Sequence, residues 1–127
     1  MLRRIAFAAI ALCATQAWAQ DPAASPELKR GKLLYIQCRA CHELKADQPH
    51  KVGPNLHGIV GRKAGTVEGF TFSPALAKSG ITWDAASLDK WIEKPSGLVP
   101  GNMMAFAGIA NPADRAAIIK YIEAESK

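Results

Sequence analysis

Apolar side chains recur at helical spacing in four stretches of this chain, and each stretch opens on a residue typical of a helix start. Serine, threonine or asparagine side chains accept a hydrogen bond from an unpaired backbone N–H there, and proline suits the first helical position. The four predicted helices begin at Ser25-Pro26, Ser73-Pro74, Thr82 and Asn111-Pro112. We expect Gly80 to end the second helix and Pro95 the third.

The segments between these helices predict loops. Residues 43–70 are rich in glycine and proline without a sustained period, residues 96–110 also lack one, and no stretch alternates as a strand would. The sequence therefore predicts an all-α fold of about four helices joined by long loops. Loops this long are unusual in so short a chain. A bulky group at the centre would explain them, because it would replace side chains that the sequence does not supply.

Residues 1–19 have the layout of a secretory signal peptide. Arg3 and Arg4 precede an apolar run over 5–14, and the small-residue pattern Ala17-Trp18-Ala19 follows it. The run is too short to span a bilayer. We expect export to the periplasm with cleavage after Ala19, a lead-in over 20–26 and one domain over 27–127. An uncleaved N-terminal anchor is the alternative.

Removal of the leader changes the charge and the cysteine count. The net charge falls from +5 to +3, and Cys13 is lost, which leaves Cys38 and Cys41. No block of like charges remains, so nucleic acid is not an expected partner.

The stretch Cys38-Arg39-Ala40-Cys41-His42 is the most informative motif. Residues three apart share a face on a helical turn, so the two thiols can reach the two vinyl groups on one edge of a haem and form thioethers. The adjacent imidazole is then delivered to the iron. This spacing is typical of c-type haem attachment.

Three other interpretations of the two cysteines compete with this one. A thioredoxin-like redox pair needs a strand–helix–strand setting, which is not predicted here. A zinc site would recruit Cys38, Cys41, His50 and His57, but at spacings unlike those of ordinary zinc fingers. A disulfide between the cysteines would give His42 no role.

From about residue 27 to residue 124 the chain resembles the soluble class I cytochromes c, the branch that includes mitochondrial cytochrome c and bacterial cytochrome c2. The matching stretches are Gly53-Pro54-Asn55-Leu56-His57-Gly58, Gly61-Arg62-Lys63, Gly69-Phe70-Thr71, Gly80-Ile81-Thr82-Trp83 and Phe106-Ala107-Gly108-Ile109. The resemblance implies the cytochrome c fold around one covalent haem c, and the work of an electron carrier.

In that family the sixth iron ligand is a methionine just after a Pro-Gly turn. Register from Pro100-Gly101 and from Phe106 implies that Met104 is this ligand, and that Met103 is an ordinary core methionine. A neutral thioether opposite the imidazole of His42 favours ferrous iron and raises the reduction potential. With no open coordination position, catalysis at the metal is not expected.

Other roles follow from the same resemblance. The carbonyl of Pro54 should accept the proton of the His42 ring, and Arg62 and Trp83 should hold a buried haem propionate. The first and last helices should cross where Gly31 and Tyr35 pack against Ile118 and Tyr121.

The chain also departs from the family pattern. Phe72, Leu76 and Trp91 replace a tyrosine, an asparagine and a tyrosine of the interior, so its hydrogen-bond network should be reduced. Positions that usually carry lysines around the exposed haem edge are Ser96, Gly97, Met103, Ala110 and Asn111, although Lys32 and Lys51 remain nearby. The acidic partners of lysine-ringed relatives cannot therefore be assumed.

The sequence as a whole predicts a monomeric periplasmic carrier that shuttles electrons between membrane redox complexes or periplasmic oxidoreductases. Respiratory, photosynthetic and dehydrogenase-linked chains all stay open. The alternatives are a haem peroxidase, if Met104 leaves the iron, and a haem-free zinc or disulfide module.

Overall fold

The computed structural model of this protein describes residues 25–127. Its helices are α1 (Pro26–Leu34), α2 (Ile36–Arg39), α3 (Pro74–Ala77), α4 (Ala85–Glu93), α5 (Pro95–Leu98) and α6 (Pro112–Glu125). No strand is present in this range, where one isolated antiparallel bridge joins Lys63 to Thr82. The predicted all-α fold class is confirmed. The predicted leader, residues 1–19, lies outside the described residues.

Three predicted helix starts are confirmed by their capping hydrogen bonds. The Ser25 hydroxyl accepts from the Leu28 N–H at 3.1 Å, and the Ser73 hydroxyl accepts from the Leu76 N–H at 3.2 Å. At the last helix, the Asn111 side chain accepts from the N–H of Ala113 at 2.9 Å. In all three cases the next residue is a proline at the first helical position.

The predicted start of the third helix was wrong by two residues. Asp84, not Thr82, caps α4, in a reciprocal pair of hydrogen bonds with Ser87. Thr82 is held in extended backbone instead, because Trp83 exchanges backbone hydrogen bonds with residues 61 and 62 and the carbonyl of residue 81 accepts from residue 64. Pairing with a distant segment thus overrides the local capping preference of threonine.

Other helix boundaries also differ from the prediction. The first predicted helix is divided at Tyr35 into α1 and α2, and α3 ends three residues before Gly80. The predicted loop over 96–110 contains most of α5, in which Pro95 is the first residue. Pro95 therefore ends one helix and starts another, which agrees with its preference for the first helical turn.

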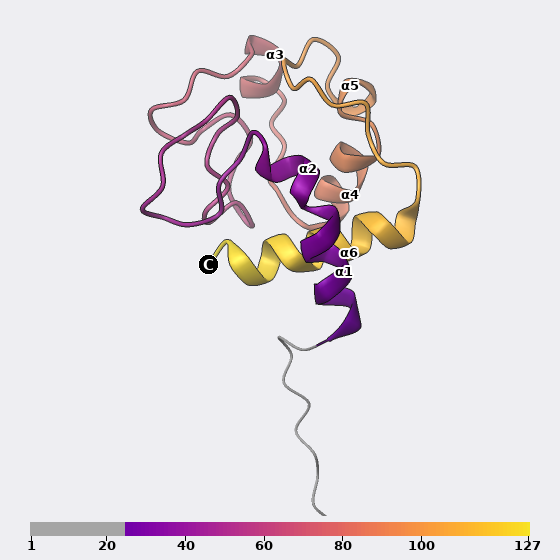
Figure 1. The fold of residues 1–127 in the computed structure, drawn as a ribbon. Helices are drawn as coiled ribbons and strands as arrows, with labels where there is room; N and C mark the ends of the chain where they lie inside the picture. Colours follow the sequence, from indigo (N-terminus) through magenta and orange to yellow (C-terminus); the bar gives the residue numbers. More distant parts are fainter. Residues whose placement is uncertain (1–24) are drawn as a thin grey trace, which may run out of the picture.

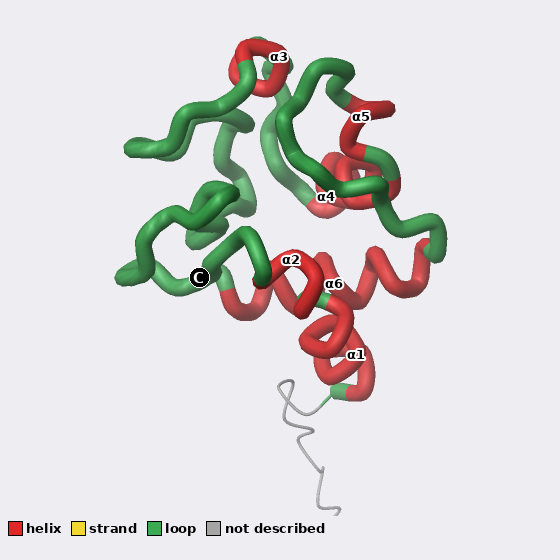
Figure 2. The backbone as a smooth tube through the Cα atoms, turned by 45° about the horizontal axis from the view of Figure 1, so that its top comes forward, coloured by secondary structure: helices red, strands yellow, loops and turns green. Residues whose placement is uncertain are grey.

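Helices α1 and α6 cross at close range, as expected from the sequence (Figures 1 and 2). A Cβ atom on the buried Gly31 would lie 2.1 Å from the carbonyl oxygen of Ala117, so only glycine permits this approach. The rings of Tyr35 and Tyr121 lie next to the crossing with their centroids 5.3 Å apart. Two ion pairs, Arg30–Asp114 and Lys120–Glu27, also join these helices.

The remaining segments curve away from this crossing. Figure 1 shows residues 40–73 on the left of the molecule and residues 95–111 on the right, with α4 above α6 on the right-hand side. The buried apolar side chains that hold these parts together include Leu44, Ile59, Trp83, Leu88, Trp91, Ile92 and Ile118. Several of them form the walls of the site described next.

Candidate functional site

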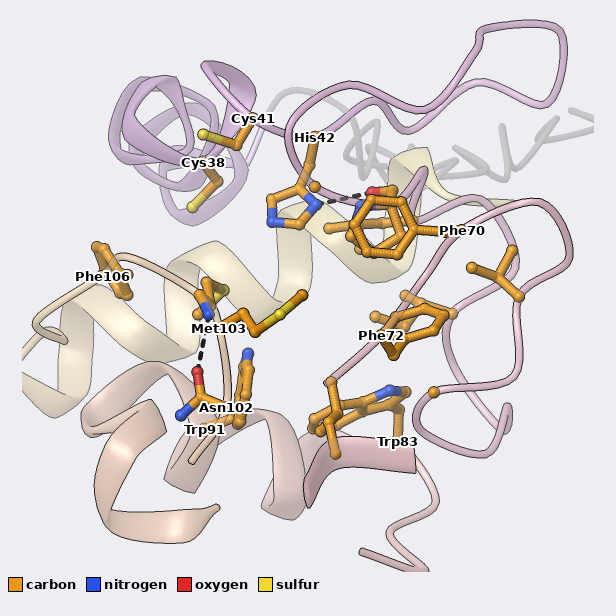
Figure 3. Close-up of a pocket in the computed structure, with 18 of the residues that line it drawn as sticks. Cys38, Cys41, His42, Phe70, Phe72, Trp83, Trp91, Asn102, Met103 and Phe106 are labelled. Carbon is orange, nitrogen blue, oxygen red and sulfur yellow. Dashed lines mark hydrogen bonds between the residues drawn. The ribbon is translucent and has the colours of Figure 1, made fainter. Parts of the chain in front are cut away.

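A largely apolar cavity lies between the loop after α2, helix α4 and the segment 102–106 (Figure 3). The volume of this cavity that is accessible to water is about 280 Å³. Its lining includes every site residue predicted from the sequence, namely Cys38, Cys41, His42, Pro54, Arg62, Trp83 and Met104. Residues separated by up to 66 positions in the chain therefore meet at one place.

The walls between these functional groups are mainly aromatic and aliphatic. The three interior departures from the family pattern, Phe72, Leu76 and Trp91, all line the cavity. Phe72 packs edge-on against Phe70 with centroids 4.9 Å apart, and Trp91 packs similarly against Trp83 at 5.4 Å. Such walls suit a large, flat, apolar ligand.

The two cysteines lie on and just after the single turn of α2, both half-buried and both free thiols. Burial raises the pKa of the Cys38 thiol to about 11, and the neighbouring Cys41 adds to this effect. Zinc binds cysteine as the thiolate, so zinc binding here would have to release this proton. Within residues 25–127, no three histidine, cysteine, aspartate or glutamate side chains are grouped to hold a metal ion.

His50, which the alternative zinc site also requires, is not available as a zinc ligand. Its Nδ1 accepts a hydrogen bond from the N–H of Asn55 at 2.9 Å, and its Nε2 donates to the carbonyl of Glu68 at 2.8 Å. Both ring nitrogens are thus occupied by the loop that His50 braces.

The orientation of the His42 ring is fixed by Pro54, in the stretch of residues 53–58. Its Nδ1–H donates to the carbonyl oxygen of Pro54 at 2.7 Å, which leaves Nε2 free to act as a ligand (Figure 3). Burial lowers the pKa of His42, against the raising effect of that hydrogen bond, so the ring is neutral near pH 7. A neutral imidazole is the form that binds iron.

Gly53 is a further member of the site that sequence reasoning did not identify. A Cβ atom at this position would lie 2.3 Å from Cε1 of His42, so a side chain here would displace the imidazole. Its N–H also donates to the carbonyl of Cys41 at 2.9 Å. The available signal was its place directly before Pro54 in the matching stretch.

The two methionines differ in their surroundings. Met104 is half-buried against the core, whereas 64% of Met103 is exposed. The interpretation of Met103 as a core residue was therefore wrong, because its side chain lies at the rim of the cavity and not among the buried side chains. The assignment of Met104 as the iron ligand stays a prediction.

Asn102 fixes the backbone that carries Met104, and it too was missed. Its side-chain oxygen accepts from the N–H of Met104 at 3.0 Å, and its amide donates to the carbonyl of Val99 at 2.8 Å (Figure 3). An asparagine directly after the Pro100-Gly101 turn was the available signal, because asparagine side chains commonly bond to nearby backbone.

Arg62 and Trp83 are brought together by the backbone pairing already described, in which the N–H of Trp83 donates to the carbonyl of Arg62 at 2.9 Å. The Arg62 side chain donates to the carbonyls of His57 at 2.8 Å and Asn55 at 3.4 Å, and burial lowers its pKa. It forms no ion pair with any of the residues 25–127. A half-buried guanidinium of this kind, with further N–H donors to offer, suits a carboxylate ligand.

The donor set and the walls fit a haem. Two thiols on one turn, an oriented neutral imidazole, a thioether-bearing segment and a guanidinium without an ion-pair partner in the described chain surround one apolar space. A helical fold whose loops enclose such a site defines a haem protein of the c type. No helix among residues 25–127 is long and apolar enough to cross a membrane.

Comparison with known proteins agrees with this class. Residues 28–125 match the family model described as cytochrome c. The chain is 54% identical to cytochrome c2 iso-2 of Magnetospirillum fulvum over 86 residues, which are 68% of this chain and 88% of that relative. It is 40% identical to cytochrome c2 of Rhodomicrobium vannielii over 105 residues, 83% of this chain and 84% of the relative.

A solved structure, cytochrome cH from Methylobacterium extorquens, is also similar. It aligns with a TM-score of 0.72 at 42% sequence identity and covers 76% of this chain and 97% of that one. The chain belongs to the cytochrome c family. It is accordingly an electron carrier with one covalently bound haem c.

Proposed function

We propose that this protein is a periplasmic one-electron carrier whose haem c is bound through Cys38 and Cys41 and ligated by His42 and Met104. The observation that carries the proposal is the single cavity lined by all four of these side chains. The haem iron supplies reversible exchange of one electron. The chain determines how the haem is oriented, which ligands the iron has and how much water reaches it.

The two side chains proposed as iron ligands would favour electron transfer over catalysis. His42 is oriented by Pro54 and kept neutral by burial, and the half-buried Met104 offers an uncharged thioether. Neutral ligands and apolar walls disfavour the extra positive charge of ferric iron, which raises the reduction potential. With both of these ligands bound, no coordination position would remain for peroxide, so the peroxidase alternative requires the loss of Met104.

Arg62 and Trp83 are proposed to hold a haem propionate. Arg62 has no carboxylate partner among residues 25–127, and the ring of Trp83 is buried in the wall beside it. A propionate at this point would pair the guanidinium and would itself escape the penalty of an uncompensated buried charge. The haem would then have one fixed orientation in the cavity.

The signal-peptide pattern of residues 1–19 supports a periplasmic location after cleavage. Membrane redox complexes or periplasmic oxidoreductases are the proposed donor and acceptor, with the carrier acting as a monomer. The test uses ascorbate-reduced haem protein mixed with membranes of the source organism. Rapid reoxidation that is blocked by inhibitors of a membrane oxidase would support the proposal. Reoxidation no faster than in buffer, together with rapid turnover of peroxide, would favour the peroxidase.

The rim of the cavity predicts docking with little dependence on salt. Val52 and Met103, at 85% and 64% exposed, lie at this rim, and Lys51 is paired with Glu43. The electron-transfer rate with a strongly acidic partner should therefore be lower, and less sensitive to salt, than that of a lysine-ringed cytochrome c.

Stopped-flow rates from low salt to about 0.15 M, where the Debye length is roughly 8 Å, measure this dependence. A lysine-ringed cytochrome c run in parallel is the control. A fall as steep as that of the control would contradict the prediction.

The positions of the lysines predict that Met104 stays bound in alkali. No lysine occurs between Lys94 and Lys120. Lys94 stands at the junction of α4 and α5 with its side chain along Gly97, and Lys120 lies within α6 in an ion pair with Glu27. Either lysine would have to break regular structure to reach the iron, so hydroxide should be the eventual replacement.

A spectroscopic pH titration of the ferric protein, repeated on Lys94→Ala, checks this expectation. Both proteins should lose the methionine at the same high pH, with a product that carries hydroxide. A transition in mild alkali, with a lysine-ligand signature that Lys94→Ala removes, would show the argument to be wrong.

A further inference from the structure

Arg115 is a buried cation that connects three separate parts of the fold. It lies on α6 and is 6% exposed. Its Nε donates to Oδ1 of Asp89 on α4 at 2.7 Å, and its Nη2 donates to Oδ2 of the same carboxylate at 3.3 Å. Its Nη1 donates to the carbonyls of Ile109 and Ala110, at 3.0 and 2.8 Å. One side chain thus ties two helices to the end of residues 102–110, the methionine segment.

The same end of the methionine segment also lies against α4 through its backbone. The N–H of Ile109 donates to the carbonyl of Ile92 at 2.9 Å. Gly108, with φ of 113°, approaches so closely that a Cβ atom would lie 2.0 Å from the carbonyl oxygen of Glu93. Residues 108–110 are therefore fixed to the end of α4, and Arg115 and Asp89 hold them there.

Between its two ends the methionine segment has few attachments. Asn102 holds the start, next to Met104. From residue 103 to residue 107, within the part of the chain that the structure describes, the backbone makes one further hydrogen bond, from the N–H of Phe106 to the carbonyl of Met104 at 2.9 Å. Met104 and Phe106 also pack against the core, but with so few backbone hydrogen bonds the segment opens more readily when either end is released.

We infer that Arg115 and Asp89 form a clamp that keeps Met104 on the haem iron, and that they act as positioning residues without touching the haem. The inference rests on the proposed function, in which Met104 is the ligand. Without the Asp89 carboxylate the buried guanidinium keeps the two carbonyls and only a distant carboxylate, Glu93, at 3.8 Å. The Arg115 guanidinium must then turn towards water to be solvated. Its hydrogen bonds to the two carbonyls break as it moves.

An added ligand that replaces Met104 reports how often the methionine segment opens. The apparent dissociation constant of such a ligand falls as the fraction of open molecules rises. Imidazole is the probe, added to the intact ferric haem protein while the iron–sulfur charge-transfer band is followed. We expect Asp89→Asn, which keeps the shape and removes the charge, to tighten imidazole binding about tenfold, equal to about 1.4 kcal/mol of opening free energy.

Glu27→Gln is the matched control, because it breaks the Lys120–Glu27 pair between α6 and α1 and leaves the methionine segment untouched. Its imidazole affinity should equal that of the parent protein. Arg115→Lys keeps the charge but loses the planar guanidinium, so it should bind imidazole more tightly than the parent protein. It is the second test of the clamp if Asp89→Asn does not fold. Denaturant unfolding of each variant is measured in parallel.

The outcomes separate this inference from the function on which it rests. If the parent protein lacks the charge-transfer band, the proposed ligation by Met104 fails and the clamp fails with it. If the band is present but the clamp variants bind imidazole like the parent, the clamp alone is overturned. It is also overturned if those variants lose stability in denaturant while their imidazole affinity stays unchanged, because the pair is then merely structural.

Discussion

Replacing Met104 with alanine should abolish the iron–sulfur charge-transfer band of the ferric protein and lower its reduction potential by hundreds of millivolts. Axial ligands set haem potentials over a range of about 0.8 V, and water or hydroxide would stabilise ferric iron where the thioether does not. Met104 is half-buried at the cavity, on a backbone that Asn102 fixes. Visible spectra and a spectroelectrochemical titration measure both effects.

Met103→Ala is the matched control, since it removes a thioether from the adjacent position. Met103 is 64% exposed at the rim, so its loss should leave the band intact and the potential nearly unchanged. If Met103→Ala abolishes the band and Met104→Ala does not, the assignment is off by one residue. If neither does, the sixth ligand is not a methionine of this segment.

Replacing both Cys38 and Cys41 with alanine should leave the exported polypeptide without covalent haem. The mature parent protein should exceed its polypeptide mass by one haem, and the excess should survive denaturation. Both thiols line the same cavity as His42 and are free to form thioethers. The double variant should show the polypeptide mass alone, and any haem that it binds should pass into acidic organic solvent.

The single variants, Cys38→Ala and Cys41→Ala, complete the series. Each should retain one thioether at reduced yield, with a shifted visible spectrum, because one vinyl group then stays unsaturated. A parent protein whose haem is fully extractable would overturn the covalent attachment. A haem that stays bound after denaturation of the double variant would show that another side chain forms the link.

The features that were predicted correctly depend mostly on residues close together in the sequence. Ser25, Ser73 and Asn111 cap their helices as predicted, because a short polar side chain before proline needs only the next few residues to act. The motif at 38–42 depends on one helical turn in the same way. The crossing of α1 and α6 at Gly31 was predicted from the family resemblance. The two helices lie so close there that no side chain fits at this position.

Predictions failed where distant segments decide the outcome. Thr82 has a good capping side chain, but the pairing of residues 81–83 with residues 61–64 keeps it extended, so Asp84 caps α4. Met103 and Met104 are identical in type, and only the fold makes one exposed and the other half-buried. No local pattern distinguishes such neighbours, because burial depends on what the rest of the chain places beside them.

The sequence by itself thus determined the all-α class and three helix starts, and its motif and family resemblance indicated residues that line one cavity. The tertiary structure decided how those residues are held. Gly53 leaves space for the ring of His42, and Asn102 orders the backbone at Met104. Asp89 and Arg115 are 26 residues apart and ordinary in their own helices. They form an ion pair only because the fold buries the Arg115 guanidinium, which must then find hydrogen-bond acceptors. Two of those acceptors are backbone carbonyls of the methionine segment.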